Sequence, residues 1–541
     1  MSKPQQIFNQ ALQLHQAGQV HEAIDLYAKV LPHDPTNAQL LFLVGTATLQ
    51  IGQHQLGIDL LNQSIMHDPN NPSAHFNQGN AFQELRRSEE AVAAYDHALA
   101  LRPDDAETHF NRGNALLSLN RKEEALVSYA QAVALNPDHA EAYNNRGIAL
   151  RDLNRLEEAV AAYDQALAAR PDYAEAYNNR GNALRGLERL DDALASYNRA
   201  LAIKPNHADA HANRGNVLQD LRRLEEARES YDRALALNPD HGEVYWNKAL
   251  LLLLTGRYLE GWELYEWRLK TDRDKRRTLP QPAWRGQGNI RGNRILIDCE
   301  QGLGDAVQFC RYLPRLGALG AEIIFEAPRP LIPLISTLDC PMTIVAKDGA
   351  LPAFDAHCPV MSLPHAFKTT LETIPADTPY LYSDKDKVQQ WQQRLGATDR
   401  LRVGLACSGS TSHKYDARRN IRLQDLLPLI DLPVEWHSLH KEYRQHDLEI
   451  LGQHPEIHQH QDALHDFSDT AALIECMDLV ISVDTSVAHV AGAMGKPVWI
   501  LLPFAPDYRW MLDRHDSPWY PTASLFRQPA IGDWQSVIAS R

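Results

Sequence analysis

The sequence predicts an α-solenoid followed by an α/β region of two lobes. A strict 34-residue period runs through the first half, whereas short apolar strands alternate with helical stretches in the second half. A charged, Pro/Gly-interrupted segment separates the two textures. We therefore expect about eight helical hairpins over 4–275, a linker over 276–292, a first lobe over 293–385 and a second lobe over 400–541.

The repeats are marked by four residue types that recur every 34 residues. The glycine and alanine positions are small enough for two helices to cross closely, tyrosine fills the space beside them, and proline ends the second helix. The period and the order of these residues are typical of tetratricopeptide (TPR) repeats, which form peptide-binding solenoids. The series are Pro35, Pro69, Pro103, Pro137, Pro171, Pro205 and Pro239; Gly45, Gly79, Gly113, Gly147, Gly181 and Gly215; Ala91, Ala125, Ala159, Ala193 and Ala227; and Tyr95, Tyr129, Tyr163, Tyr197 and Tyr231.

An asparagine series keeps the same period on the first helix of the repeats. We expect it to line the concave face, where an amide can donate to and accept from the backbone of an extended peptide. The alternative is that these amides only join neighbouring repeats. The series resembles the ladder on the inner face of O-linked N-acetylglucosamine transferases, which implies an acceptor protein in the groove. Its members are Asn77, Asn111, Asn145, Asn179, Asn213 and Asn247.

Composition excludes several classes of function. The formal net charge of −15 argues against a nucleic-acid or anionic-membrane binder. The sequence shows no apolar run of membrane-spanning length, we expect no secretion signal, and the six cysteines form no CxxC pair. We expect free thiols, no membrane insertion and a cytoplasmic protein.

Six strand candidates appear in the second half. They lie at 295–300, 321–327, 401–408, 434–440, 478–484 and 497–503. The first is followed by Gly302, Gly304 and Asp305 at the expected start of a helix. Glycines at such a turn let the backbone approach a ligand. Asp305 is either a helix cap or a general base that faces the cleft between the lobes.

The strand at 478–484 carries the strongest motif. It ends at Asp484, and Thr485, Ser486 and His489 open the small-residue helix that follows. This places N–H groups, hydroxyls and the positive end of a helix dipole at the carboxyl end of the sheet. We expect a phosphate or diphosphate sugar donor to bind here, and an ordinary capped helix is the alternative.

Two segments carry a family resemblance. VDTSVAHVAGAMGKPVW and EQGLGDAVQFCRYLPRL resemble the heptosyltransferase-like (family 9) glycosyltransferases in their TPR-fused bacterial form. The resemblance implies a GT-B domain of two Rossmann-like lobes, with Asp305 as the base. It also implies that Asp484, Thr485 and Ser486 hold the donor phosphate and sugar.

In that family a basic residue after the first strand of the second lobe contacts phosphate. The corresponding segment begins at Ser408 and offers Lys414 and Arg419, although the spacing differs and both charges could simply be solvated. A DxD pair after a strand is absent from the sequence, so we expect no metal and no cofactor besides a nucleotide-sugar co-substrate.

The resemblance implies a protein O-glycosyltransferase. It would move a hexosyl, heptosyl or nonulosonyl group, with inversion, from a nucleotide sugar to Ser or Thr of a protein such as flagellin. A glycosyltransferase with a lipid or glycan acceptor and a non-catalytic TPR scaffold with a degenerate GT-B half are the alternatives. The sugar, the nucleotide and the oligomeric state stay open.

Overall fold

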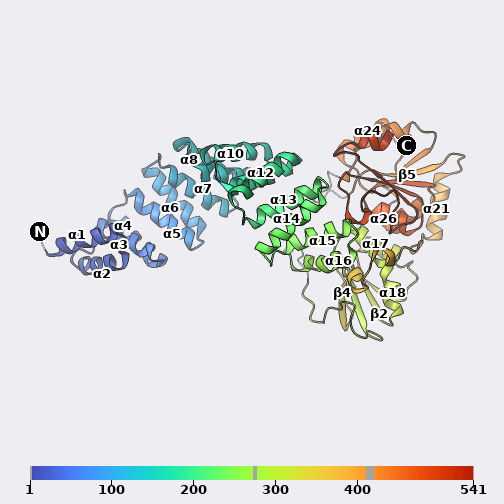
Figure 1. Cartoon of the computed structure of the whole chain (residues 1–541), viewed down its shortest axis with the longest axis horizontal. Coiled ribbons are helices and arrows are strands. Elements are labelled where there is room, and N and C mark those ends of the chain that lie inside the picture. The colour runs from blue at the N-terminus through green and yellow to red at the C-terminus, as the bar shows by residue number, and fades with distance from the viewer. Residues whose placement is uncertain (1–2, 272–276, 410–418, 540–541) are drawn as a thin grey trace. The chain divides into compact units, whose positions relative to one another are not determined.

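The computed structural model describes residues 3–271, 277–409 and 419–539 (Figure 1). The chain divides into two compact units, which are residues 1–218 and residues 219–541. Helical hairpins fill the first unit and continue into the second, which also contains both α/β lobes. The sequence placed all repeats in one domain, whereas the structure groups the last hairpins with the lobes.

Sixteen α-helices follow one another between residues 3 and 265, all of which the structure describes, and confirm the predicted α-solenoid. They are α1 (Lys3–Gln16), α2 (Val20–Val30), α3 (Ala38–Gln50), α4 (His54–His67), α5 (Pro72–Glu84), α6 (Ser88–Leu101), α7 (Ala106–Ser118), α8 (Lys122–Leu135), α9 (Ala140–Asp152), α10 (Leu156–Ala169), α11 (Ala174–Gly186), α12 (Leu190–Ile203), α13 (Ala208–Asp220), α14 (Leu224–Leu237), α15 (Gly242–Leu254) and α16 (Tyr258–Tyr265). Among the described residues, no helix combines the length and apolar character that a bilayer span requires.

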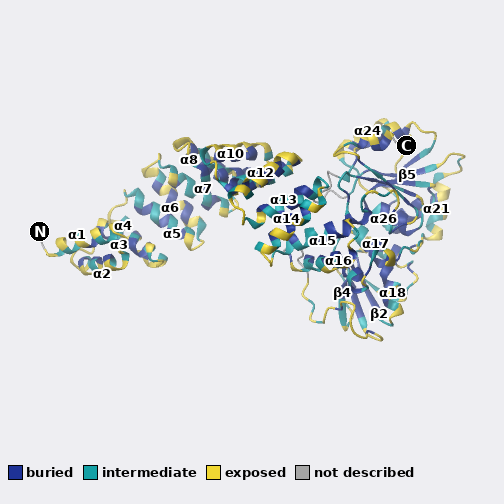
Figure 2. Ribbon diagram, in the orientation of Figure 1, coloured by how far each residue is buried: buried dark blue, intermediate teal, exposed yellow. Residues whose placement is uncertain are grey.

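In the hairpins that contain Gly79, Gly113, Gly147 and Gly181, the glycine packs on the tyrosine ring of the partner helix. Tyr163 is fully buried, and a Cβ added to Gly147 would lie 2.5 Å from its Cε1 atom. The same approach recurs at Gly79, Gly113 and Gly181. The period therefore records a steric requirement at these helix crossings. Figure 2 shows the buried positions along the inside of the hairpins.

The first α/β lobe contains a four-stranded parallel sheet with the order β3-β2-β1-β4. Its strands are β1 (Arg294–Asp298), β2 (Glu322–Ala327), β3 (Met342–Ala346) and β4 (Ala356–Pro359). Its helices are α17 (Leu303–Phe309), α18 (Leu313–Ala318), α19 (Ile332–Ile335) and α20 (Leu363–Ala366). The predicted linker contacts the first sheet, because the backbone N–H of Trp284 donates to the carbonyl oxygen of His357 on β4 at 2.8 Å.

The second lobe contains a six-stranded parallel sheet with the order β10-β9-β8-β5-β6-β7. Its strands are β5 (Arg402–Ala406), β6 (Glu435–Ser438), β7 (Ile457–His458), β8 (Leu479–Val483), β9 (Val498–Leu502) and β10 (Ala523–Arg527). Its helices are α21 (Lys385–Leu395), α23 (Leu423–Ile430), α24 (Gln445–Gln453), α25 (Phe467–Glu475), α26 (Ser486–Ala493) and α27 (Trp534–Ala539). The two parallel sheets confirm the predicted α/β class.

Short 3₁₀ turns complete the described structure. They are η1 (Leu31–His33), η2 (Glu266–Lys270), η3 (Cys310–Tyr312), η4 (Arg329–Leu331), η5 (Val360–Ser362), η6 (Leu371–Thr373) and η7 (Tyr508–Trp510). Two of them, η2 and η7, lie next to the candidate site described below.

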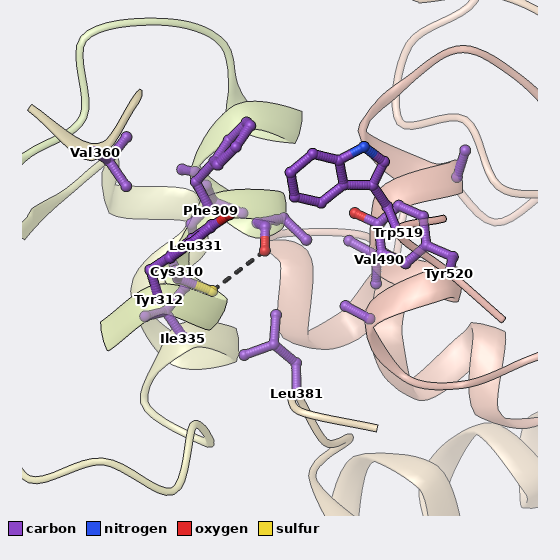
Figure 3. Packing of buried hydrophobic residues seen from close by; sticks show 14 of the residues in the cluster. Phe309, Cys310, Tyr312, Leu331, Ile335, Val360, Leu381, Val490, Trp519 and Tyr520 are labelled. Atoms are coloured by element: carbon purple, nitrogen blue, oxygen red, sulfur yellow. Dashed lines mark hydrogen bonds between the residues drawn. The ribbon is translucent and has the colours of Figure 1, made fainter. Parts of the chain in front are cut away.

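One apolar core runs through both lobes. Figure 3 shows Phe309 and Tyr312 of the first lobe in the same cluster as Val490 and Trp519 of the second. The ring centroids of Phe309 and Trp519 are 5.5 Å apart. Arg311 adds a polar tie, because its buried guanidinium donates to the Trp519 carbonyl at 2.6 Å. The junction between the lobes is thus packed like a protein interior.

A buried histidine pair joins β6 to the segment just after β7. His437 and His460 are 2% and 5% exposed, and His437 Nδ1 is 3.1 Å from His460 Nε2. Burial lowers the pKa of each to about 4, and the His458 ring stacked on His437 adds to the effect. Both imidazoles are therefore neutral in the folded protein at neutral pH.

We predict that replacing Gly147 with alanine lowers the free energy of unfolding by about 1–3 kcal/mol, because the new methyl group overlaps the buried Tyr163 ring. Gly45→Ala is the matched control, since its methyl group would lie 3.1 Å from the more adaptable Leu61 side chain. Urea denaturation of both variants measures the difference. Equal losses would contradict the steric explanation.

We also predict that stability falls as the pH drops from 6.5 toward 4. The unfolded chain takes up protons on His437 and His460 over that range and the folded chain does not, so acid favours unfolding. Asp484, whose pKa is raised to about 6, works in the opposite direction because its folded form holds the proton more tightly. Thermal melts at pH 7 and pH 5 should show a smaller drop for His437→Asn/His460→Asn than for the parent. The exposed-site variant His67→Asn should keep the parent's drop.

Candidate functional site

The two helix starts that the sequence singled out lie against each other. The helices α17 and α26 pack together where the lobes meet (Figure 1). A Cβ on Gly304 would lie 2.7 Å from Cδ2 of His489, so only glycine permits this approach. The structure thereby brings Gly302, Gly304 and Asp305 of the first lobe next to His489 of the second.

Asp305 is the third residue of α17 and has two partners. Its carboxylate accepts the backbone N–H of Gly302 at 2.8 Å, which caps the helix, and it forms an ion pair with Arg509. Burial raises the pKa of Asp305, while Arg509 and the Gly302 hydrogen bond oppose that rise. The two interpretations offered by the sequence are therefore compatible, because the capping carboxylate also faces the other lobe.

Arg509 is a site residue that sequence reasoning missed. It lies on η7, shortly after the carboxyl end of β9, and is 8% exposed. Its Nε donates to Gln308 at 2.6 Å and its Nη1 donates to Asp507 at 2.8 Å. The usable signal was the Asp-Tyr-Arg sequence just beyond a strand end, since ligand-binding residues gather at the carboxyl ends of parallel strands.

Asp484 and His489 form the second-lobe part of the site. Burial raises the pKa of Asp484 to about 6, the negative charge of Asp507 adds to this, and Arg509 opposes it. His489 Nδ1 lies 2.9 Å from the hydroxyl of Tyr520, and its Nε2 is 3.8 Å from Asp484 Oδ1. Burial and the nearby arginines hold the pKa of His489 well below its ordinary value, so the ring is neutral.

The hydroxyl residues of this motif take different positions. Ser486 is the first residue of α26, as the sequence predicted. Thr485 is buried beside it, and its Oγ1 is 3.2 Å from the Ser482 hydroxyl of β8. The first turn of α26 directly follows β8, and the free N–H groups and dipole of such a helix start can stabilise an anion.

Arg419 contacts the same helix start. Arg419 donates from Nη1 to the carbonyl of Asp484 at 3.1 Å. Ser408 donates its backbone N–H to His440 Nε2 at 3.2 Å. That contact leaves the ring proton on Nδ1, which is 3.2 Å from Ser438 Oγ, and burial lowers the pKa of His440 to about 4. Lys414, the other sequence candidate, lies outside the described residues.

The asparagine series makes contacts between repeats. Each of the first five amides donates from Nδ2 to a side chain of the preceding repeat, and the sixth, Asn247, lies on α15. The bonds are Asn77 to Thr46 (3.0 Å), Asn111 to Asn80 (3.3 Å), Asn145 to Asn114 (2.9 Å), Asn179 to Asn144 (3.0 Å) and Asn213 to Asn178 (3.0 Å). An amide keeps a second N–H and its oxygen after one such bond, so peptide binding and repeat contacts are compatible.

Comparison with known families gives two kinds of match. Tetratricopeptide repeat models match residues 87–120, 113–151, 145–208 and 208–241. The model of glycosyltransferase family 9 (heptosyltransferase) matches residues 464–502, which span α25, β8, α26 and the strand β9.

Similar individual proteins cover parts of the chain. Protein FlbA of Caulobacter vibrioides is 29% identical over 315 residues, which are 52% of this chain and 51% of the relative, so the match spans about half of that protein. Among solved structures, YrrB, described as a TPR protein with an unusual peptide-binding site, is 25% identical over 35% of this chain and 98% of its own (TM-score 0.32). MamA is 23% identical over 30% of this chain and 95% of its own (TM-score 0.30). The two family matches support a TPR-fused glycosyltransferase, as does the observed fold of a helical solenoid followed by two α/β lobes with parallel sheets.

Proposed function

We propose that this chain is a protein O-glycosyltransferase of GT-B type, which transfers a sugar from a nucleotide sugar to Ser or Thr of an acceptor protein. The observation that carries the proposal is the partly buried carboxylate of Asp305, which pairs with Arg509 of the other lobe and is carried by the helix that packs on α26. The family 9 match includes α26 and the strand before it. A base on one lobe and an anion-binding helix start on the other are the two groups that a single displacement needs.

In this proposal Asp305 removes the proton of the acceptor hydroxyl as that oxygen attacks the anomeric carbon. The bond to the donor phosphate breaks on the opposite side, so the configuration inverts. Burial raises the pKa of Asp305, which strengthens it as a base, and Arg509 limits the rise. The pairing keeps the carboxylate ionised and oriented before the acceptor arrives.

The departing phosphate would lie at the start of α26. Backbone N–H groups at Thr485 and Ser486, together with Arg419 and Arg509, would stabilise its negative charge. These groups perform the task that a divalent cation performs in other glycosyltransferases, so we propose a metal-independent reaction. Neutral His489, fixed by Tyr520, would contact the donor sugar or phosphate as a hydrogen-bond partner.

The solenoid would select the acceptor. The asparagines from Asn77 to Asn247 would bind the backbone of an extended acceptor segment with the amide groups that the repeat contacts leave available. This recognition is independent of side chains, so it suits a protein substrate with several modified positions. Flagellin is one acceptor that fits the family resemblance.

We predict that Asp305→Asn lowers transfer by a factor of about 10² to 10⁴, the range expected for the loss of a general base, while donor binding persists. Transfer is measured with a labelled nucleotide sugar and cell extract, followed by counting of label in protein bands and in the lipid fraction. Label in protein supports the proposal, whereas label confined to lipid supports a lipid or glycan acceptor.

Asp469→Asn is the matched control for this variant. Asp469 is also the third residue of a helix, accepts the backbone N–H of its N-cap residue Asp466, and pairs with a cation, Lys387, at 2.6 Å. It lies outside the candidate site, so its loss should reduce stability and leave turnover near the parent value. Similar turnover in both variants would reduce Asp305 to a helix cap.

We predict that alanine at Asn111, Asn145, Asn179 and Asn213 raises the KM for a protein acceptor and spares donor hydrolysis. Each lost neutral hydrogen bond contributes about 0.5–1.5 kcal/mol, so KM should rise at least tenfold. The control is alanine at Asn144 and Asn178, which removes two of the repeat contacts and leaves the asparagine series intact. A KM that rises equally in the control would show that the amides act only by joining repeats.

A further inference from the structure

The last hairpin of the solenoid is built into the α/β unit. Trp262 and Tyr265 of α16 are 1% and 2% exposed and belong to the same apolar core as Phe309 of α17. The ring centroids of Trp262 and Phe309 are 6.1 Å apart. This hairpin therefore packs directly behind the helix that carries Asp305, and all of these residues belong to the unit 219–541.

Polar contacts join the end of the hairpin to the loop before Asp305. The hydroxyl of Tyr265 lies 3.1 Å from Gln301 Nε2 and 3.2 Å from Gln301 Oε1. Arg268, on η2, is 3% exposed and donates from Nη2 to Glu300 Oε1 at 2.7 Å. Glu300 and Gln301 immediately precede Gly302, whose N–H binds the Asp305 carboxylate.

The Arg268 guanidinium is held on its other side as well. It donates from Nη2 to the Ser362 hydroxyl at 2.7 Å and from Nη1 to Glu266 at 2.8 Å. A buried cation with this many fixed partners is costly to move, because any lost contact leaves a charge unpaired in a low dielectric. Arg268 thus links Glu300 to Ser362 of η5 and to Glu266 of η2.

The same hairpin contacts the turn that carries Arg509. Trp262 packs edge-on against Tyr508 with 5.7 Å between ring centroids, and Tyr265 lies 6.1 Å from the same ring. One element therefore touches the residues next to both members of the Asp305–Arg509 pair. An equivalent tyrosine one repeat earlier, Tyr231, makes its hydroxyl contact with Gln219 of the solenoid at 3.1 Å instead.

We propose that Tyr265 and Arg268 are positioning residues of the transfer site, which fix Glu300 and Gln301 and thereby set where Asp305 meets Arg509. This inference rests on the proposed function for its catalytic meaning. The final repeat then belongs to the catalytic unit, and a fragment that begins after residue 275 loses this support together with the acceptor groove.

The test compares full-length Tyr265→Phe with Tyr231→Phe. Both changes keep the buried ring and remove one hydroxyl, so general effects on the solenoid should be similar. In Tyr265→Phe we expect faster amide hydrogen exchange at residues 300–305 and a kcat lowered about 2- to 10-fold, the effect of one neutral hydrogen bond. The KM for the nucleotide sugar should stay near the parent value, and the acid limb of the pH–kcat profile should shift. Tyr231→Phe should match the parent in all four measurements.

Arg268 provides a second comparison. Arg268→Lys keeps the charge beside Glu300 and should retain more activity and more exchange protection at 300–305 than Arg268→Gln. Unchanged exchange and an unchanged pH profile in Tyr265→Phe, or equal changes in Tyr231→Phe, would overturn the positioning role. If the parent transfers no sugar from any donor, the proposed function fails, and the exchange comparison still decides whether the last repeat fixes this loop.

Discussion

The close packing of α17 on α26 is the constraint on which the candidate site depends. Gly304 admits the ring of His489, and this approach sets two helix starts from different lobes side by side. Arg509 is buried there between Asp305 and Asp507. A buried cation without carboxylate partners would be strongly destabilising. Arg509 can therefore be buried at this helix contact only because the two aspartates balance its charge. The shared apolar core holds that geometry in place.

This core also limits how the lobes can move. An interface filled by Phe309, Val490 and Trp519, and tied by buried Arg311, does not open without exposing a large apolar area to water. A ligand at the start of α26 would therefore meet a largely preformed site. Under the proposed function, rigidity of this kind would favour catalysis by positioned charges, because the arginines and helix N–H groups would need little rearrangement as the phosphate leaves.

The sequence was sufficient for the parts of the fold that repeat or that alternate. The 34-residue period identified the hairpins because the contact of glycine with tyrosine recurs at several successive crossings. The six apolar strand candidates correspond to β1, β2, β5, β6, β8 and β9. The remaining strands were missed for physical reasons. Two of them, β4 and β7, have only four and two residues, so neither shows an apolar run of strand length.

Long-range contacts were beyond the reach of local patterns. Arg509 is 204 residues from Asp305 along the chain. Arg268 is 32 residues from Glu300, and the predicted linker over 276–292 lies between them. The asparagine series shows the opposite difficulty. Its period is visible in the sequence but does not reveal that the first five amides already bond to the preceding repeat.

The grouping of the last hairpin with the lobes changes how recognition and chemistry relate. If the solenoid were a separate module, acceptor binding would raise only the local concentration of the hydroxyl near the base. Here α16 and η2 contact the Glu300–Gln301 loop and the Tyr508 turn. Under the proposed function, these contacts would connect an acceptor bound to the final repeat with both Asp305 and Arg509. Arg268, which is buried at the end of the helical array, has two carboxylate partners. Apolar packing alone could connect the array to the lobe without the desolvation cost of buried charges, so the proposed positioning role accounts for this arrangement.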